Sequence, residues 1–297
     1  MLRYQEFPTP IQLLENFNNN AFGVEVYLKR DDLIHPFISG NKWRKLKGYL
    51  ADAQSHNVSK LVTFGGAFSN HLIATACAGA LFGFETKAYI RGDYVDINNP
   101  VLTLCRIYGM ELLPVTKVEY AKLKNFSSAI KENEYWINEG GYGELGTIGC
   151  AEIIDELDGY FNHIVCAVGT GTTVAGLIKG LGNNQINTRI HGIAVLKNAS
   201  YLNKEIEQLT ANSHDNFELH TSYYYGGYGK VDFQITDYIK QFAKHYGVLL
   251  DPIYTSKMML ATIELIESGV IKPNQKVLCI HTGGLTGLLS DKMIKKF

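Results

Sequence analysis

The chain has 297 residues, of which 46% are hydrophobic, so it can bury a large core and is too long for one small domain. Its 28 lysine and arginine residues against 29 aspartate and glutamate residues leave a net charge of -1, which excludes a general attraction to nucleic acid or to an anionic membrane surface. No stretch approaches the ~20 apolar residues of a membrane span or has a signal-peptide core, so we expect a cytoplasmic protein with no membrane or nucleic-acid partner.

Short strands and helices are predicted to alternate along the whole chain. Phe7 to Pro10 is rigid and extended because each proline fixes its own φ angle. Strands are predicted at 24–29, 61–64, 87–90, 111–113, 135–137, 164–168, 190–195 and 277–281. Helices are predicted at 11–14, 41–53, 72–81, 100–108, 150–157, 236–246 and 257–268, with another after Gly171. This alternation is typical of parallel α/β layers.

The helix after Asn41 turns one lysine inward. At ~100° per residue, a single stripe carries Lys42 and the residues Leu46, Tyr49 and Ala53, whereas Arg44 and Lys47 are predicted to point away.

This lysine also lies in the first turn, with Gly40 as the turn and Asn41 as the N-cap. Burial and the helix dipole both lower the pKa of an ammonium there, which favours a nucleophilic amine that forms a Schiff base. The plain alternative for Lys42 is a lysine that reaches water from the edge of an amphipathic helix.

A second motif predicts a binding site for one phosphate. The buried strand 164–168 turns through Gly169-Thr170-Gly171-Thr172-Thr173 into a helix. Glycines let backbone amides approach a ligand, the helix N-terminus favours negative charge, and threonine hydroxyls add donors. The lysine of a P-loop is absent, and Val174 stands where a dinucleotide fingerprint has glycine. Tight packing of the strand on the helix is the alternative reason for these glycines.

Four further loops carry candidate polar groups. Ser69 and Asn70 open a helix after Gly65-Gly66, and helix capping alone would also explain them. His71 resembles neither a catalytic base nor a metal ligand. Thr282 ends the last predicted strand, where open α/β sheets bind ligands. Tyr228 and Tyr254, among 18 tyrosines, lie in loops.

Cysteine and histidine spacing gives no case for a metal ion. The five cysteines fall mostly in apolar runs and are read as reduced core residues: Cys77, Cys105, Cys150, Cys166 and Cys279. No Cys-x-x-Cys pair occurs, and the nine histidines show no His-x-x-x-His spacing, so we expect no metal.

A buried amine, a single-phosphate site and a neutral hydroxyl after a late strand describe a pocket for pyridoxal 5'-phosphate. Nearly end to end, the chain resembles the D-cysteine desulfhydrase and 1-aminocyclopropane-1-carboxylate (ACC) deaminase family of fold-type-II pyridoxal-phosphate enzymes. The resemblance is carried, in the family's order, by Leu28-Lys29-Arg30-Asp31-Asp32-Leu33, Gly40-Asn41-Lys42-x-Arg44-Lys45-Leu46, Ser69-Asn70-His71, Tyr228-Gly229, Asp251-Pro252-x-Tyr254-Thr255-x-Lys257 and His281-Thr282-Gly283-Gly284.

The resemblance implies a role for each of these motifs. Lys42 would carry the cofactor as a Schiff base, and Asn70 would contact the ring hydroxyl. Ser69 with neighbouring amides would bind the substrate carboxylate, and Lys45 would balance the phosphate charge. The phosphate itself would be held by Gly169, Thr170, Gly171, Thr172 and Thr173. From the place of Thr282 after the last strand, we further expect its hydroxyl at the pyridine nitrogen, with Thr255 close by. Tyr228 or Tyr254 is expected to orient the substrate or assist proton transfer.

The resemblance also implies an architecture like that of tryptophan synthase β, with two open, twisted, mostly parallel α/β lobes and the cofactor between them. Residues 1–42 and 154–297 would form the larger, cofactor-binding lobe, and residues 43–153 the smaller lobe. The family further implies a homodimer acting on a small amino acid. Two positions depart from the family pattern: Ser39 replaces a common glycine, and Tyr142-Gly143 replaces small or amide residues.

One position separates the activities of this family. Thr255 stands where ACC deaminases have glutamate beside the pyridine nitrogen, and threonine matches the desulfhydrase branch. We therefore expect β-elimination from D-cysteine or a related D-amino acid, giving pyruvate, ammonia and sulfide. The alternatives are an ACC deaminase, giving 2-oxobutanoate and ammonia, and a non-catalytic binder of pyridoxal phosphate or another phosphorylated ligand.

Overall fold

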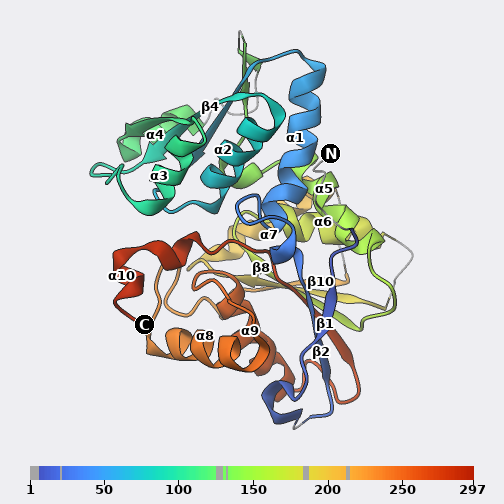
Figure 1. Ribbon diagram of the computed structural model, residues 1–297. Helices are drawn as coiled ribbons and strands as arrows, with labels where there is room; N and C mark the ends of the chain where they lie inside the picture. The colour runs from blue at the N-terminus through green and yellow to red at the C-terminus, as the bar shows by residue number, and fades with distance from the viewer. Residues whose placement is uncertain (1–6, 21, 125–129, 132, 183–186, 212–214) are drawn as a thin grey trace.

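The chain forms two α/β layers, one above the other in Figure 1. The computed structural model describes residues 7–20, 22–124, 130–131, 133–182, 187–211 and 215–297. The larger sheet has the strand order β1-β2-β11-β8-β9-β10. Its strands are β1 (Ile11–Leu13), β2 (Glu25–Lys29), β8 (His163–Val168), β9 (Arg189–Ala194), β10 (Phe217–His220) and β11 (Lys276–Ile280).

The smaller sheet has the order β5-β4-β3-β7-β6. Its strands are β3 (Lys60–Gly65), β4 (Glu85–Arg91), β5 (Glu111–Val115), β6 (Ile130–Lys131) and β7 (Glu134–Trp136). Only β1 with β2 and β6 with β7 pair antiparallel among the described strands, so the prediction of mostly parallel sheets is confirmed. The lobe boundaries given above stay a prediction.

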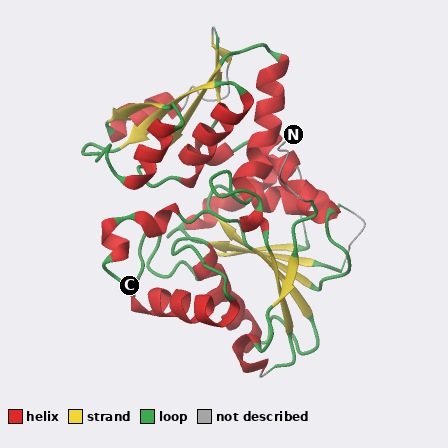
Figure 2. Ribbon diagram, viewed as in Figure 1, coloured by secondary structure: helices red, strands yellow, loops and turns green. Residues whose placement is uncertain are grey.

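Helices cover these sheets, as Figure 2 shows. They are α1 (Asn41–Ser55), α2 (Asn70–Phe82), α3 (Pro100–Ile107), α4 (Lys117–Lys124), α5 (Glu144–Asp155), α6 (Thr172–Leu181), α7 (Leu202–Thr210), α8 (Phe233–Tyr246), α9 (Thr255–Glu267) and α10 (Asp291–Ile294). Among the described helices, none is both long and apolar enough to cross a membrane. Helix α5 packs against α1 on one side and α6 on the other, so it joins the two layers.

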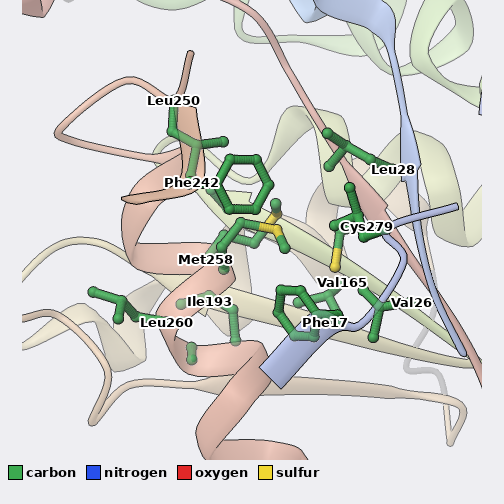
Figure 3. Close-up of a cluster of buried hydrophobic side chains, with 14 of the residues drawn as sticks. Phe17, Val26, Leu28, Val165, Ile193, Phe242, Leu250, Met258, Leu260 and Cys279 are labelled. Carbon is green, nitrogen blue, oxygen red and sulfur yellow. The ribbon is translucent and has the colours of Figure 1, made fainter. Parts of the chain in front are cut away.

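The larger sheet buries both faces, as a parallel sheet must. Every residue of β8 is buried, and its neighbouring side chains belong to different apolar clusters. Figure 3 shows one cluster, in which Val165 and Ile193 of the sheet meet Phe242 of α8 and Met258 of α9. All five cysteines are free and buried, which confirms their reading as reduced core residues.

Two predicted elements were wrong. The segment 11–14, predicted as a helix, contains strand β1, because Ile11 to Leu13 pair with the edge of β2 and so short a segment with three apolar residues suits either structure. Helix α5 begins at Glu144 rather than 150, because its glycines serve close packing rather than breaking the helix. A Cβ atom on Gly149 would lie 1.9 Å from the Arg44 carbonyl oxygen of α1. Helices α4, α7 and α10 and strands β6 and β10 were not predicted.

The prediction that Arg44 points away from the core is also wrong. The Arg44 side chain is 1% exposed and donates to both carboxylate oxygens of Asp31, at 3.1 and 3.0 Å. It also contacts both oxygens of Glu156, one of them at 2.9 Å. Glu156 accepts a further hydrogen bond from Lys29 at 2.7 Å. Lys47 lies nearer to solvent and pairs with Glu152 at the surface.

This buried network ties β2, α1 and the end of α5 together through hydrogen-bonded ion pairs. Burial raises the pKa of Glu156, but hydrogen bonds from Arg44 and Lys29 outweigh it and hold that pKa below its usual value. The stabilisation is therefore present above the carboxyl's unfolded-state pKa and is lost as pH falls through the lower folded-state pKa.

We expect Arg44→Met to lower the free energy of unfolding by about 3–5 kcal/mol, because it leaves buried Asp31 without a cation and Glu156 with Lys29 alone. Lys47→Met, which removes the half-exposed pair with Glu152, should cost less than about 1 kcal/mol and serves as the control. Urea denaturation followed by circular dichroism measures both. Equal small losses in the two variants would contradict this account.

Candidate active site

Lys42 is the second residue of α1 and is partly buried. Gly40, rather than Asn41, is the N-cap; its φ of 57° and its contact with the Thr282 carbonyl leave no room for a side chain. The Lys42 amine donates to the Gly140 carbonyl oxygen at 3.5 Å. Burial, and next the charge of Lys45, lower the pKa of Lys42 to about 7. The amine is thus about half neutral at neutral pH.

Gly140 lies between the Lys42 amine and the loop that follows β8. Its carbonyl oxygen also accepts from Lys45 Nζ at 3.4 Å, and Lys45 is 3% exposed. On the other side, a Cβ atom on Gly140 would lie 3.5 Å from the Thr170 methyl group. The loop between β8 and α6 therefore lies beside both amines.

That loop has the geometry of an anion site. Gly171 is the N-cap of α6 with φ 83°, and no side chain caps the first-turn amides. Thr170 and Thr172 place their hydroxyls 3.3 Å apart. The Thr173 hydroxyl accepts a hydrogen bond from Asn41 at 2.9 Å, which ties this loop to the start of α1.

Two tyrosines lie at the other side of the same loop. A Cβ atom on Gly169 would lie 3.1 Å from the Tyr254 ring, so a side chain here would push the ring away by a few tenths of an ångström. The Tyr254 hydroxyl donates to the Tyr228 hydroxyl at 3.4 Å. Burial, and next the neighbouring Tyr228, raise the pKa of Tyr254 well above its ordinary value, which keeps this phenol protonated.

Asn70 lines a cavity of about 120 Å³ together with Lys42. The side-chain oxygen of Asn70, Oδ1, accepts from the backbone amide and the hydroxyl of Thr286, at 3.1 and 2.6 Å. Its amide nitrogen therefore stays free to donate to a ligand. Ser69 is the N-cap of α2 and accepts from the His71 amide at 3.2 Å, so the capping alternative holds, and its own hydroxyl proton is still available.

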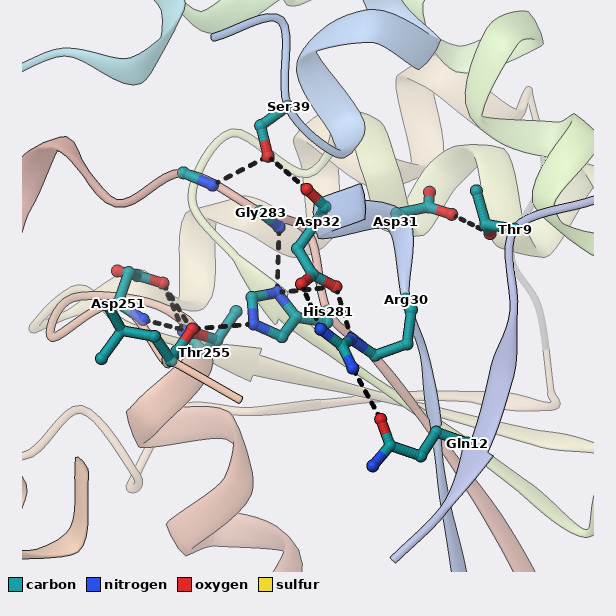
Figure 4. Close-up of polar contacts among 12 residues, drawn as sticks. Thr9, Gln12, Arg30, Asp31, Asp32, Ser39, Asp251, Thr255, His281 and Gly283 are labelled. Atoms are coloured by element: carbon teal, nitrogen blue, oxygen red, sulfur yellow. Dashed lines mark hydrogen bonds and ion pairs between the residues drawn. The ribbon is translucent and has the colours of Figure 1, made fainter. Parts of the chain in front are cut away.

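The two candidate threonines differ in what surrounds them. The Thr255 hydroxyl donates to Asp251 Oδ2 at 2.8 Å and accepts from the Asp251 amide at 2.8 Å, as Figure 4 shows. In contrast, no hydrogen bond of the Thr282 hydroxyl is found within the described residues, and Thr282 is 7% exposed. Thr282 is thus the better placed of the two to bind a ligand atom.

Sequence reasoning missed three residues here. Thr286 fixes Asn70, but nothing in its local sequence signals this. His71 was set aside, yet it is buried near the lysines: burial, then Lys42 and Lys45, lower its pKa well below its ordinary value. Buried Lys257 donates to the carbonyls of Tyr224 and Gly227, at 2.9 and 2.7 Å, and so holds the loop that carries Tyr228.

Pyridoxal phosphate fits these residues. Neither Lys42 nor Lys45 has a carboxylate within 4.0 Å among the described residues, so two buried amines lack an anion. A phosphate at the uncapped end of α6 would supply it. The nearly neutral Lys42 amine suits an aldehyde, and the Asn70 amide suits a ring hydroxyl.

Comparison with known proteins decides the family. The family model described as "Pyridoxal-phosphate dependent enzyme" matches residues 2–283. The chain belongs to this family. Pyridoxal 5'-phosphate is therefore its cofactor, and the fold is that of the fold-type-II enzymes.

Individual relatives agree with this assignment. A Thermotoga maritima protein provisionally named 1-aminocyclopropane-1-carboxylate deaminase is 32% identical to this chain, and the alignment covers 96% of each of the two chains. The mitochondrial bifunctional D-cysteine desulfhydrase/1-aminocyclopropane-1-carboxylate deaminase of Arabidopsis thaliana is 29% identical over 95% of this chain and 77% of that protein. The crystal structure of an ACC deaminase homologue, 32% identical, superposes with a TM-score of 0.84 over 98% of this chain and 94% of that one.

We expect Lys42 of the cofactor-free protein to react with pyridoxal phosphate at a rate that rises with pH up to about 7 and then levels, because only the neutral amine attacks an aldehyde. Borohydride trapping at a series of pH values, followed by peptide mapping, measures this. Label on Lys45 or Lys257, or a rate that still rises near pH 10, would contradict the assignment. Exposed Lys244 provides the internal comparison.

Proposed function

We propose that this member of the family is a lyase that removes the β-substituent of D-cysteine or a related D-amino acid and yields pyruvate, ammonia and sulfide. The observation that carries the proposal is that Thr282 and Thr255, the side chains expected near the pyridine nitrogen, are themselves uncharged, while the Asp251 carboxylate beside Thr255 is already hydrogen-bonded within the protein. The family is one of pyridoxal-phosphate-dependent lyases and deaminases. The residues around Lys42 are each suited to one task in such a reaction.

The N-terminus of α2 is suited to hold the substrate carboxylate. Backbone amides at this end and the Ser69 hydroxyl proton offer donors, and the helix dipole favours an anion. Lys42 and Asn70, the first residue of that helix, line the same cavity. A carboxylate bound there would bring the substrate Cα toward the Lys42 amine.

Lys42 is suited to take the Cα proton. Its pKa of about 7 leaves much of the amine unprotonated at neutral pH, and the matched pKa favours proton transfer in both directions. Pyridoxal phosphate, when bound, supplies the conjugated ring that accepts the electron pair left at Cα.

Tyr254 is suited to assist the departing group. Its phenol stays protonated and is held by Tyr228, which is 50% exposed at the solvent side. A protonated phenol can donate to a leaving thiolate, whereas it cannot serve as a base at neutral pH. Lys257 supports this arrangement because it anchors the loop before Tyr228.

The groups near Thr255 favour elimination over cyclopropane opening. ACC has no Cα hydrogen, so opening its ring demands a more strongly electron-withdrawing, protonated pyridine. Asp251 is the nearest carboxylate to Thr255, and it already accepts from three backbone amides and the Thr255 hydroxyl. A threonine hydroxyl supplies no negative charge to keep the ring nitrogen protonated.

A second candidate function is ACC deamination to 2-oxobutanoate and ammonia. It is supported by the names of the relatives from Thermotoga maritima and Arabidopsis thaliana. The remaining alternative, a binder without catalysis, gains support from no specific contact. We also propose, on the family resemblance, that the enzyme acts as a homodimer.

We expect purified enzyme to release pyruvate from D-cysteine or β-chloro-D-alanine, and little 2-oxobutanoate from ACC. Coupled assays of both keto acids, with L-cysteine and D-serine in parallel, measure the ranking. Faster turnover of ACC than of D-cysteine would replace the proposal with ACC deamination. A cofactor absorption band without turnover of any of these substrates would favour the binder.

We expect Tyr254→Phe to lower kcat for D-cysteine by about 100-fold or more, because the proton donor to the leaving thiolate is lost. The effect should be smaller for β-chloro-D-alanine, since chloride leaves without a proton. Tyr120→Phe, which removes another buried phenol, is the control and should leave both rates nearly unchanged. Equal losses for the two substrates would argue against proton donation by Tyr254.

A further inference from the structure

Three histidines from neighbouring strands form a row across the larger sheet, away from the site described above. His163 begins β8, at the opposite end of that strand from Gly169. His163 Nδ1 lies 2.9 Å from His191 Nε2 of β9, and His191 Nδ1 lies 2.9 Å from His220 Nε2 of β10. The adjacent ring centroids are 5.1 and 5.2 Å apart. Because a nitrogen lies about 1.2 Å from its ring centre, these rings meet edge to edge.

The hydrogen bond between Gln275 and His163 determines which ring nitrogens in this row carry a proton. Gln275 Oε1 accepts from the Lys272 amide at 2.7 Å and contacts His163 Nε2 at 2.9 Å, so that nitrogen carries the proton. His163 Nδ1 is then the acceptor for His191 Nε2–H. His191 Nδ1 is left with a lone pair directed at His220.

A carboxylate stands beside the far end of the row. Glu218 pairs in parallel register with His191, so both side chains leave the same face of the sheet. Its Oε1 lies 3.7 Å from His220 Nδ1. One ligand atom from each of these three residues lies within 4.8 Å of the others. Two imidazoles and a carboxylate are a donor set typical of Zn²⁺ sites.

The spacing of the His191 and His220 rings suits a metal ion between them as well as a hydrogen bond. With zinc–nitrogen bonds of about 2.05 Å and a tetrahedral angle, two ligating imidazoles have centroids about 5.2 Å apart. The centroids of His191 and His220 are 5.2 Å apart. Each ring therefore needs to swing only about its own centre for the nitrogens to separate and admit an ion, with the backbone in place.

We propose that His191 Nδ1, His220 Nε2 and the Glu218 carboxylate form a binding site for a divalent transition metal ion, of which Zn²⁺ fits best, with water completing the shell. The ion replaces the proton shared by the two imidazoles. That proton moves from Nε2 of His220 to Nδ1, so the imidazole stays neutral and no redox change occurs. His163 and Gln275 are positioning residues, because they hold the proton on His191 Nε2 and leave Nδ1 for the ion.

The site would have a structural effect. Strand β10 is at the edge of the larger sheet, where β9 is its one partner among the strands that the structure describes. An ion held between His191 of β9 and His220 of β10 would link the edge strand to its neighbour. Sequence spacing concealed these ligands, because the sheet brings together two histidines that are 29 residues apart.

The test is a Co²⁺ and Zn²⁺ titration of the chelator-treated holoenzyme. We expect one ion per chain, a visible d–d absorption band with Co²⁺, and an unfolding midpoint that rises by at least about 2 °C with saturating Zn²⁺. His220→Gln and Glu218→Gln should each weaken binding about tenfold or more. His56→Gln, in an exposed pair with Asp52 at 3.6 Å, is the matched control and should bind as the wild type does.

Lys42→Ala separates this proposal from the proposed function. That variant should lose lyase activity and keep the metal site, since Lys42 contributes nothing to it. Lack of saturable binding in the wild type would overturn the metal site, as would binding of unchanged affinity in His220→Gln. Neither result would bear on the lyase activity.

Discussion

The site depends on two lysine amines that donate to the same backbone carbonyl oxygen. Lys42 and Lys45 both donate to the Gly140 carbonyl, and no described carboxylate lies within reach of either. A buried cation without an anion is costly, so the protein alone leaves this charge imperfectly balanced. Burial lowers the pKa of both amines, that of Lys42 to about 7, and Lys45 lies beside the predicted phosphate site. The requirement for an anionic cofactor thus follows from the charges of the protein itself.

On the other side of the same turn of α1, a buried cation is paired with carboxylates. Arg44 is buried between Asp31 and Glu156, where each carboxylate oxygen has a donor. This side is fully paired without a ligand, whereas the side that carries Lys42 is not. Helix α1 is consequently anchored by one face while the other stays available for chemistry. Close packing with α5, permitted by Gly149, holds both faces in register.

The sequence was sufficient for the elements whose apolar patterns are strong and for the residues named by local motifs. The strand 164–168, the loop after it and Lys42 could all be predicted, because strand, turn and helix signals coincide there. Arg44 could not, since helical periodicity assumes one buried face and α1 is covered by α5 on the side that faces Arg44. Asn70 was predicted, but Thr286 was not, because their contact joins positions 216 residues apart.

The contrast between Thr255 and Thr282 shows why residue type alone does not assign a role. Both are threonines near the carboxyl end of the larger sheet, and both are buried. Asp251 occupies the Thr255 hydroxyl through a donor and an acceptor contact, so Thr255 acts by shaping the start of α9. Thr282 follows β11 after one residue, and its carbonyl accepts from the Asn41 amide at 3.2 Å, so its backbone contacts the start of the helix that carries Lys42. Because no partner of the Thr282 hydroxyl is found among the described residues, this threonine keeps a donor for a ligand atom, whereas Thr255 has already used its own.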